Sequence, residues 1–358
     1  MDELLFGKSN YLATVSLPTP LPMSPLFSAL PIARYRFTAL VQQPLPLPDY
    51  AGSLLRGQFG AALRQVACMT RQPNCPGCPL LTTCPYSLVF EAPPPPQGAH
   101  TLQNFSQIPN PYVLEPPAAG AHVLDAGDAL VFHLVLVGHA RVQLPLIVFA
   151  LQRMLAQGLT RQRVPADLMQ VDWVDAHDTA HPIWSHHHPT LAAHPATLRF
   201  NGSKLIATDA GGARASAPKD TQLTLRIHTP LRLQHQGQPL GVSQLTPRAL
   251  VATVARRVAL LMEFHAGQAH WGEAARQLIH ASDTLTDTRD LHWFDWTRYS
   301  SRQQQEMTLG GVLGHWTLHG SPEQIAALTP WLWLGQWLHA GKNATMGMGA
   351  YTLQTAGV

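Results

Sequence analysis

The 358-residue sequence predicts an α+β protein made of two βαββαβ units in tandem. Three observations lead to this prediction. The second half of the chain shows strand and helix patterns in this order, the first half repeats them around two insertions, and a turn-rich stretch of small residues, 209–219, lies between them. We therefore expect one ferredoxin-like domain over residues 1–215 and a second over 216–358.

The second half shows the order more clearly. Apolar residues recur at helical spacing in two segments, and the segments around them alternate in the way typical of strands. The expected elements are strand 222–233, helix 245–265, strand 292–300, strand 308–319, helix 322–339 and strand 348–353.

The first half follows the same order less regularly, after an irregular arm of about 30 residues. Asp49 is expected to cap a helix over about 50–68, and Gly158 to end a second helix. The remaining expected elements are strands 33–41, 112–114, 129–138 and 197–206 and helix 144–157. Two insertions interrupt them, a cysteine loop, 68–84, and a histidine-rich loop, 172–195.

The composition is that of a globular and mildly basic chain. Hydrophobic residues make up 46%, charged residues 13%, and the formal net charge is +3. A polyanionic partner is compatible with this balance but not required by it. Because no apolar run is long enough to span a bilayer and Met1 is followed by Asp2 and Glu3, we expect a cytoplasmic protein without a membrane partner.

All four cysteines lie within the cysteine loop, at Cys68, Cys75, Cys78 and Cys84. Four thiolates on one loop suit a tetrahedral zinc ion or an iron–sulfur cluster, and two short-range disulfides are the alternative. The spacing resembles the [4Fe–4S] loop of helix-hairpin-helix DNA glycosylases. We therefore favour a [4Fe–4S] cluster slightly over zinc, in either case as a structural staple of the loop.

A glycine-rich loop, 341–349, lies between the last helix and the last strand. Glycine lets main-chain amides approach a ligand closely, and Lys342 adds a positive charge beside them. A phosphate is a suitable ligand for such a loop, although a simple tight turn explains the glycines equally well. The loop matches neither a P-loop nor a dinucleotide-binding pattern.

Taken together, these pieces resemble the CRISPR repeat-processing endoribonucleases of the RAMP superfamily. The resemblance rests on Leu55–Arg64 leading into the cysteine loop and on four later motifs, 229–233, 296–300, 310–314 and 341–351. It implies tandem ferredoxin-like domains that bind CRISPR repeat RNA, or the mature crRNA, in a cleft between them. It also implies that the glycine-rich loop contacts the RNA backbone.

The resemblance implies cleavage without a catalytic metal. The ribose 2′-OH attacks the adjacent phosphate and leaves a 5′-OH end and a 2′,3′-cyclic or 3′ phosphate. Relatives commonly carry a histidine in the first helix where this chain has Ala61. The alanine is explained by an engineered inactivating change, by catalysis through other residues, or by binding without cleavage. We take His339 as the candidate base and Lys342 as the residue that stabilises the phosphorane, although His339 also suits a helix end.

Several further residues are candidates for contact with RNA. Arg56 and Arg64 lie on roughly one face of the first helix, where a solvated face is the alternative for each. Arg298 and Arg302 flank Tyr299, which suits either base stacking or packing in the core. The full set of RNA-contact candidates is Arg56, Arg64, Arg298, Tyr299, Arg302, Gly341, Lys342, Asn343, Thr345, Gly347 and Gly349.

Other features favour structural roles. The histidines at 181, 186, 187, 188 and 194 lack the helical spacing of metal ligands and are expected on a flexible surface loop. Trp331, Trp333 and Trp337 are expected to pack between the domains. Two alternatives to an endoribonuclease stay open. One is a repeat-binding subunit of a CRISPR effector complex that does not cut, and the other is an iron–sulfur DNA-binding protein.

Overall fold

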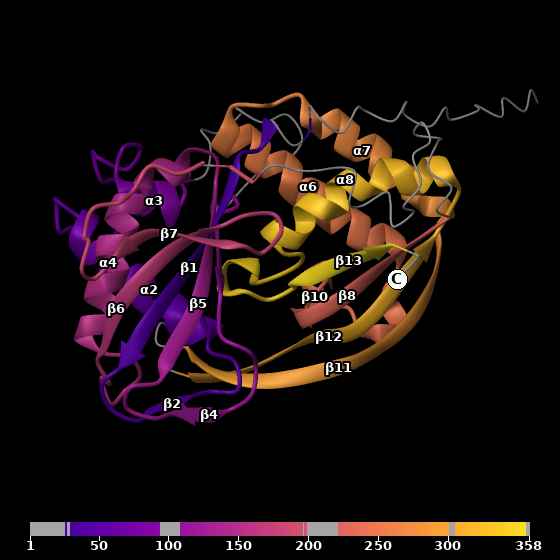
Figure 1. Ribbon diagram of the computed structural model, residues 1–358. Helices are drawn as coiled ribbons and strands as arrows, with labels where there is room; N and C mark the ends of the chain where they lie inside the picture. Colours follow the sequence, from indigo (N-terminus) through magenta and orange to yellow (C-terminus); the bar gives the residue numbers. More distant parts are fainter. Residues whose placement is uncertain are drawn as a thin grey trace, which may run out of the picture.

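The fold was analysed in a computed structural model, which describes residues 26, 29–93, 108–195, 197–198, 221–300 and 305–355 (Figure 1). Two antiparallel sheets, one in each half of the chain, form its framework. The expected arm before residue 30, the boundary at 209–219 and most of the expected strand 197–206 lie outside the described residues. None of the described helices is both long and apolar enough to cross a membrane.

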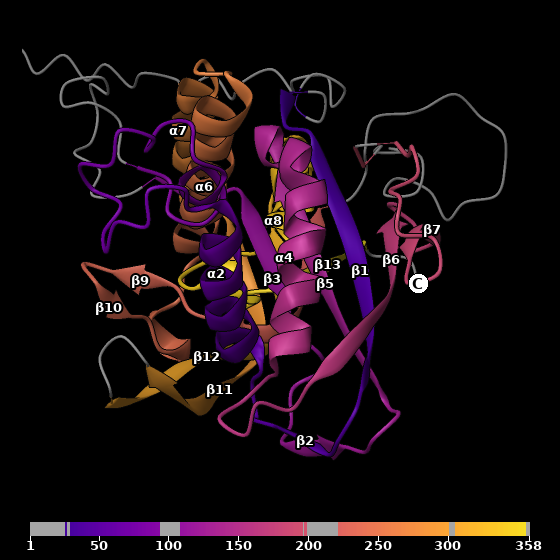
Figure 2. The same cartoon turned by 90° about the vertical axis from the view of Figure 1, so that its left-hand side faces the viewer.

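The first half contains a βαββαβ unit with one additional strand. Its sheet has the order β3-β5-β1-β6-β7, so the first and third strands of the unit lie next to each other in the middle. Helices α2 and α4 lie side by side on one face of this sheet (Figure 2). The elements are β1 (Ile32–Val41), α2 (Gly52–Ala67), β3 (Tyr112–Glu115), β5 (Ala129–Val137), α4 (Leu144–Gln157), β6 (Ala166–Val174) and β7 (Ala180–Ser185).

Short elements complete this half. After the cysteine loop, Pro85 begins the helix α3 (Pro85–Val89), as its fixed φ angle favours at a first helical position. The others are the paired strands β2 (Leu45–Leu47) and β4 (His122–Leu124) and the 3₁₀ helix η1 (Gly138–Gln143).

The second half repeats the unit. Its sheet has the order β11-β12-β8-β13, which again places the first and third strands of the unit in the middle. Ser321 and Gln324 form a capping box at the start of α8. The elements are β8 (Gln222–Leu231), β9 (Gln234–His235), β10 (Gln238–Pro239), η2 (Val242–Gln244), α6 (Pro247–Ala266), α7 (Trp271–Ala281), η3 (Ser282–Thr284), β11 (Thr286–Ser300), β12 (Gln305–His319), α8 (Pro322–Leu338), η4 (Ala344–Met346) and β13 (Tyr351–Thr355).

The two halves share a core, because the first sheet is buried on both faces. Along β5, Phe132 and Leu134 pack with α2 and α4, whereas Val135 and Val137 pack with residues of α6 and α8. This follows from the alternation of side chains along a strand and explains why β5 is almost continuously apolar. Figure 1 shows α6 and α8 on the side of this sheet opposite α4.

The expected histidine-rich insertion, 172–195, is wrong in two stretches, 172–174 and 180–185, which are strands. Its beginning belongs to β6, which serves as the fourth strand of the first unit, and β7 adds a further edge strand. Asp172 makes the end of β6 read as polar in the sequence. Its side chain is fully buried because Arg36 and Gln170 both donate hydrogen bonds to its carboxylate.

Candidate nucleic-acid interface

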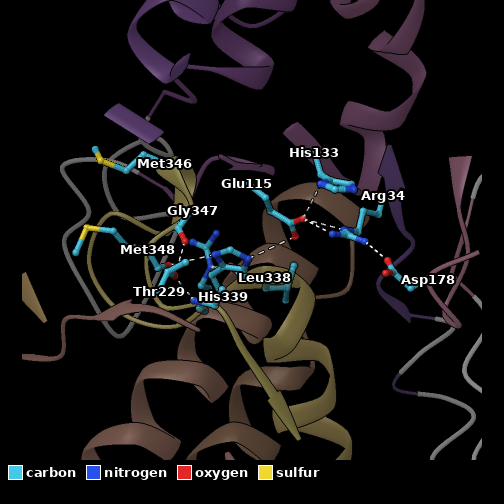
Figure 3. Close-up of polar contacts among 12 residues, drawn as sticks. Arg34, Glu115, His133, Asp178, Thr229, Leu338, His339, Met346, Gly347 and Met348 are labelled. Atoms are coloured by element: carbon cyan, nitrogen blue, oxygen red, sulfur yellow. Dashed lines mark hydrogen bonds and ion pairs between the residues drawn. The ribbon is translucent and has the colours of Figure 1, made fainter. Parts of the chain in front are cut away.

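The glycine-rich loop is held by two motifs that lie far from it in the sequence. Thr229 Oγ1 donates a hydrogen bond to the carbonyl of Gly347 at 2.7 Å (Figure 3). The carbonyl of Arg232 accepts from the amide of Lys342 at 2.9 Å, and the Arg232 guanidinium donates to the Gly310 carbonyl at 2.8 Å. The structure therefore brings together the motifs around residues 229, 310 and 341.

Two glycines of this loop are required by close approach of backbone. Gly347 has φ 90°, and a Cβ there would lie 2.7 Å from the Leu114 carbonyl oxygen. Gly349 has φ 74°, and a Cβ there would collide with the Ala340 carbonyl. Both residues are buried, and their amides donate to carbonyls of the protein itself. The expected contact of these two amides with a phosphate therefore does not fit this structure.

The rest of the loop is more accessible. Lys342 is exposed, whereas Gly341, Asn343 and Thr345 are half-buried. The Lys342 amide is already bonded to Arg232, so it is the ammonium group of Lys342 that is free to meet a ligand. Among the loop residues predicted to contact RNA, the structure thus favours the side chains of Lys342, Asn343 and Thr345.

The loop lies against the start of α2. Gly52 has no room for a Cβ beside the Met346 carbonyl, and Tyr50 donates a hydrogen bond to that carbonyl at 3.0 Å. On the same side, Arg56 Nε donates to the Tyr112 hydroxyl at 3.0 Å. Burial raises the pKa of Tyr112 to about 12, against the opposing effects of Arg56 and of a hydrogen bond with Thr345. Arg56 is therefore linked through Tyr112 to the glycine-rich loop.

A small apolar cluster packs against the junction of the glycine-rich loop with the start of α2. Tyr50 packs on Trp296 of β11 with ring centroids 4.7 Å apart, and Met346 and Met348 of the glycine-rich loop join the same cluster. The loop is thus fixed between α2 of the first half and the β11–β12 hairpin of the second.

A groove of about 920 Å³ runs along α2 from Arg56 to the cysteine loop. The residues that line it include Arg56, Ala61 and Arg64, all three predicted from the sequence to belong to the site. Four arginines and one glutamate line the groove, a net charge of +3 that equals the formal net charge of the whole chain. No histidine is among the described residues that line it.

His339 lies elsewhere, in a buried network between the halves. It has φ 57° and is 2% exposed, with Nδ1 3.2 Å from the Met348 carbonyl oxygen and Nε2 3.5 Å from Glu115 Oε1 (Figure 3). A substrate cannot reach this ring in the arrangement observed. The geometry gives His339 a role in joining the halves, and its catalytic role stays a prediction.

Glu115 is the centre of that network, and sequence reasoning did not single it out. Its carboxylate also lies 2.7 Å from Arg34 Nη2 and 3.9 Å from His133 Nδ1. Burial raises the pKa of Glu115, but the hydrogen bond from His339 and the charges of Arg34, His339 and His133 outweigh it and lower the pKa to about 2. Burial, reinforced by the charge of Arg34, lowers the pKa of His133 to about 4.

The four cysteines all line one small cavity inside their loop. The hydroxyl of Thr70 lies 3.9 Å from Cys68 Sγ and 3.5 Å from Cys78 Sγ, and Gly77 has φ 82° in the turn between Cys75 and Cys78. The four thiols fit a metal in number and chemistry. However, no three His, Cys, Asp or Glu residues in the described ranges are arranged to hold a metal ion, so the metal centre stays a prediction.

Comparison with known proteins agrees with this fold. Residues 225–351 match the family described as CRISPR-associated endoribonuclease Cas6, and residues 30–196 match a family described as an N-terminal domain. The product complex of a Thermus thermophilus Cas6 has 16% identity, a TM-score of 0.54 and coverage of 90% of this chain and 99% of that one. This chain is a RAMP-type protein of the family that processes precursor CRISPR RNA.

A partial Cas6-RT-Cas1–Cas2 complex is similar at 14% identity and a TM-score of 0.54, over 91% of this chain and 46% of that one. At these identities the two solved structures support the fold alone. No curated protein sequence matches the chain.

The remaining predicted residues of this RAMP-type protein are only partly described. Arg298 and Tyr299 lie on β11, paired in register with Met307 and Glu306 of β12, and Arg302 lies outside the described residues. Of the five histidines expected on a flexible loop, His181 lies 3.2 Å from Asp175, and His194 contacts the Tyr35 hydroxyl at 3.1 Å. The contact of His194 with Tyr35 of β1 attaches that segment to the first sheet, and His181 lies on the strand β7.

The expected packing role of the α8 tryptophans agrees with the structure. Trp331 and Trp333 are buried in the core that the two halves share. Arg34 of β1 lies over the Trp337 ring at 5.9 Å from its centroid. Trp337 thus contacts the first half of the chain from the second.

Proposed function

We propose that this protein binds CRISPR repeat RNA and cleaves the precursor of crRNA at the groove along α2. The observation that carries the proposal is the junction where the glycine-rich loop of the second half meets the start of α2 in the first, beside the hydrogen bond from Arg56 to Tyr112 and a groove of net charge +3. A concave surface with arginines that form no ion pair attracts a phosphate backbone, and this attraction supplies much of the affinity of proteins for nucleic acids.

The reaction that suits these residues is in-line attack of a 2′-OH on the adjacent phosphate. A bond forms between the 2′-oxygen and phosphorus, the bond to the 5′-oxygen breaks, and a proton passes from the first oxygen to solvent and from solvent to the second. The products carry a 2′,3′-cyclic phosphate and a 5′-OH. Arg56 and Lys342 are the cations that stabilise the charge on the phosphorane, and the groove supplies the alignment.

A proton acceptor with a pKa near neutrality is missing from the described lining of the groove, since Ala61 stands where the resemblance places a histidine. We therefore expect tight binding and slow cleavage by the protein with Ala61. The variant Ala61→His should cleave faster by about 10²- to 10⁴-fold, the usual contribution of a positioned general base or acid.

A cleavage assay on repeat RNA in the presence of EDTA tests this proposal. The matched control is Gln65→His, which places an imidazole at another exposed position of the same helix and groove and should not accelerate cleavage. If Ala61→His binds repeat RNA but leaves it intact, the catalytic proposal fails. The protein would then be a repeat-binding subunit of a CRISPR effector complex, which Ala61 favours as the second candidate.

The cysteine loop is proposed to hold one structural metal centre. The support is that all four thiols line the same cavity, beside the hydroxyl of Thr70. Protein purified without air should contain either one zinc ion or one [4Fe–4S] cluster, and a broad visible absorption band identifies the cluster. Cys78→Ser should abolish the metal content. Protein that contains neither metal would contradict this part of the proposal.

A further inference from the structure

The groove along α2 has a second wall, formed by the cysteine loop. Three residues, Cys68, Gln72 and Tyr86, line both the groove and the small cavity that holds the four thiols. The cysteine loop therefore shapes the groove as well as its own conformation. Whatever fixes the cysteines also fixes one side of the groove.

Two arginines of the groove are held in place, Arg64 by this wall and Arg56 by the ring of Phe90, which follows α3. Arg64 Nη2 donates to the carbonyls of Gln72 and Pro73 at 2.6 and 2.7 Å, and its guanidinium lies 5.9 Å from the centre of the Tyr86 ring. Arg56 lies 4.7 Å from the centre of the Phe90 ring. Guanidinium groups held on aromatic faces keep their remaining N–H groups directed outward, which suits phosphate recognition.

The sequence of α2 is adapted to this arrangement. A Cβ at Gly60 would collide with the Phe90 ring, so glycine is needed for Phe90 to lie flat against the helix under Arg56. The remaining two arginines, Arg71 on the cysteine loop and Arg153 on α4, are exposed. None of the four arginines forms an ion pair within the part of the chain that the structure describes.

The groove extends away from the proposed cleavage site. Ala61 lines the groove between Arg56 and Arg64 along the helix, and the partner of Arg56, Tyr112, touches the glycine-rich loop. Arg56 and Arg64 are eight residues apart on one helix, a rise of about 12 Å. At about 3.4 Å of rise for each stacked nucleotide, this length holds roughly three or four nucleotides.

We propose that this groove binds the single-stranded nucleotides that flank the cleaved phosphate, with the cysteine loop as its outer wall. The inference rests on the proposed function and adds to it the part of the substrate that the groove holds. It assigns to the cysteine loop a direct part in RNA binding, through Arg71 and through the position it gives to Arg64 and Tyr86.

The test compares two RNAs, a repeat with its single-stranded flank and the same repeat without it. Their affinities are measured by fluorescence anisotropy over a range of salt concentrations, for the wild type, Arg153→Ala and Arg71→Ala. Both side chains are exposed, so neither variant is expected to unfold the protein. Each should weaken binding of the flanked RNA by about three- to tenfold and lower the salt slope by about one, without affecting the shorter RNA.

Two controls sharpen the result. Arg153→Lys should restore most of the affinity because it keeps the charge, and Arg276→Ala should change nothing because Arg276 is paired with Glu273 on α7. Equal affinity of wild type and both variants for the flanked RNA would overturn the binding of the flank in this groove, whereas cleavage of repeat RNA by Ala61→His would still support the proposed function. A wild type that prefers duplex DNA over repeat RNA would overturn the proposed function itself.

Discussion

Glu115 joins the two halves of the protein, and its removal should cost a measurable amount of stability. The carboxylate is 16% exposed and contacts Arg34 from its own half and His339 from the other. Its pKa is lowered from 4.5 to about 2, despite the opposing effect of burial. A shift of this size corresponds to about 3 kcal/mol of folding free energy at neutral pH.

The pH dependence has a defined sign. A carboxyl whose pKa is lower in the folded than in the unfolded chain stabilises fully above the unfolded pKa, and that stabilisation is lost as the pH falls toward the folded pKa. The difference in unfolding free energy between wild type and Glu115→Gln should be about 3 kcal/mol at pH 7 and about 1 to 2 kcal/mol at pH 3. Urea unfolding followed by tryptophan fluorescence at each pH measures it.

Asp178 offers a matched control, because it pairs with the same arginine. Its side chain is 79% exposed, so Asp178→Asn should cost less than about 1 kcal/mol. The reasoning would be refuted if Glu115→Gln unfolded within about 0.5 kcal/mol of the wild type at pH 7, or if the two variants were equally destabilised.

Three further predictions concern burial, backbone and charge. His265 is 3% exposed, and burial lowers its pKa to about 4. The free energy of unfolding should therefore fall by up to about 3 kcal/mol as the pH drops from about 6.5 to 4. In thermal unfolding, the variant His265→Asn should show a weaker dependence on pH over this range. Gly347→Ala should cost about 2 kcal/mol or more, whereas Gly57→Ala, with open space around it, should gain about 0.5 to 1 kcal/mol in urea titrations. Lys342→Ala should lower the salt slope of RNA binding by about one, and an unchanged slope would remove its ammonium group from the contacts.

The two-unit architecture could be predicted because its elements carry local patterns. The alternation in Ile32–Val41, the apolar stripe of α2 and the glycine that ends α4 each depend only on neighbours in the sequence. Helix α7 was missed although a signal was present. Trp271, Ala275 and Leu278 recur at helical spacing and are buried.

Other features depend on partners that are distant in the sequence. The end of strand β6, from Asp172 onward, was mistaken for part of a polar loop because the partners of Asp172 are needed to explain why it is buried. The glycines of the loop were assigned to ligand contact, whereas Gly347 and Gly349 are required by backbone that approaches from β3 and from the end of α8. Sequence spacing does not show which backbone will lie there.

Only the part of the candidate site that lies on one helix could be predicted from the sequence. Arg56, Ala61 and Arg64 share a helix, so their common groove follows from helical geometry. The contact between Glu115 and His339 joins residues of opposite halves, and no local pattern marks either as a member of a pair.

Hydrogen–deuterium exchange with and without repeat RNA shows whether the RNA lies along α2 and the glycine-rich loop, because it reports which backbone the RNA covers. We expect slower exchange in peptides from α2 and the cysteine loop, 56–73, and from the glycine-rich loop at 342–345. Tight RNA binding that leaves these peptides unchanged and protects only other surfaces, such as the exposed turn between β6 and β7 at 177–179, would contradict it.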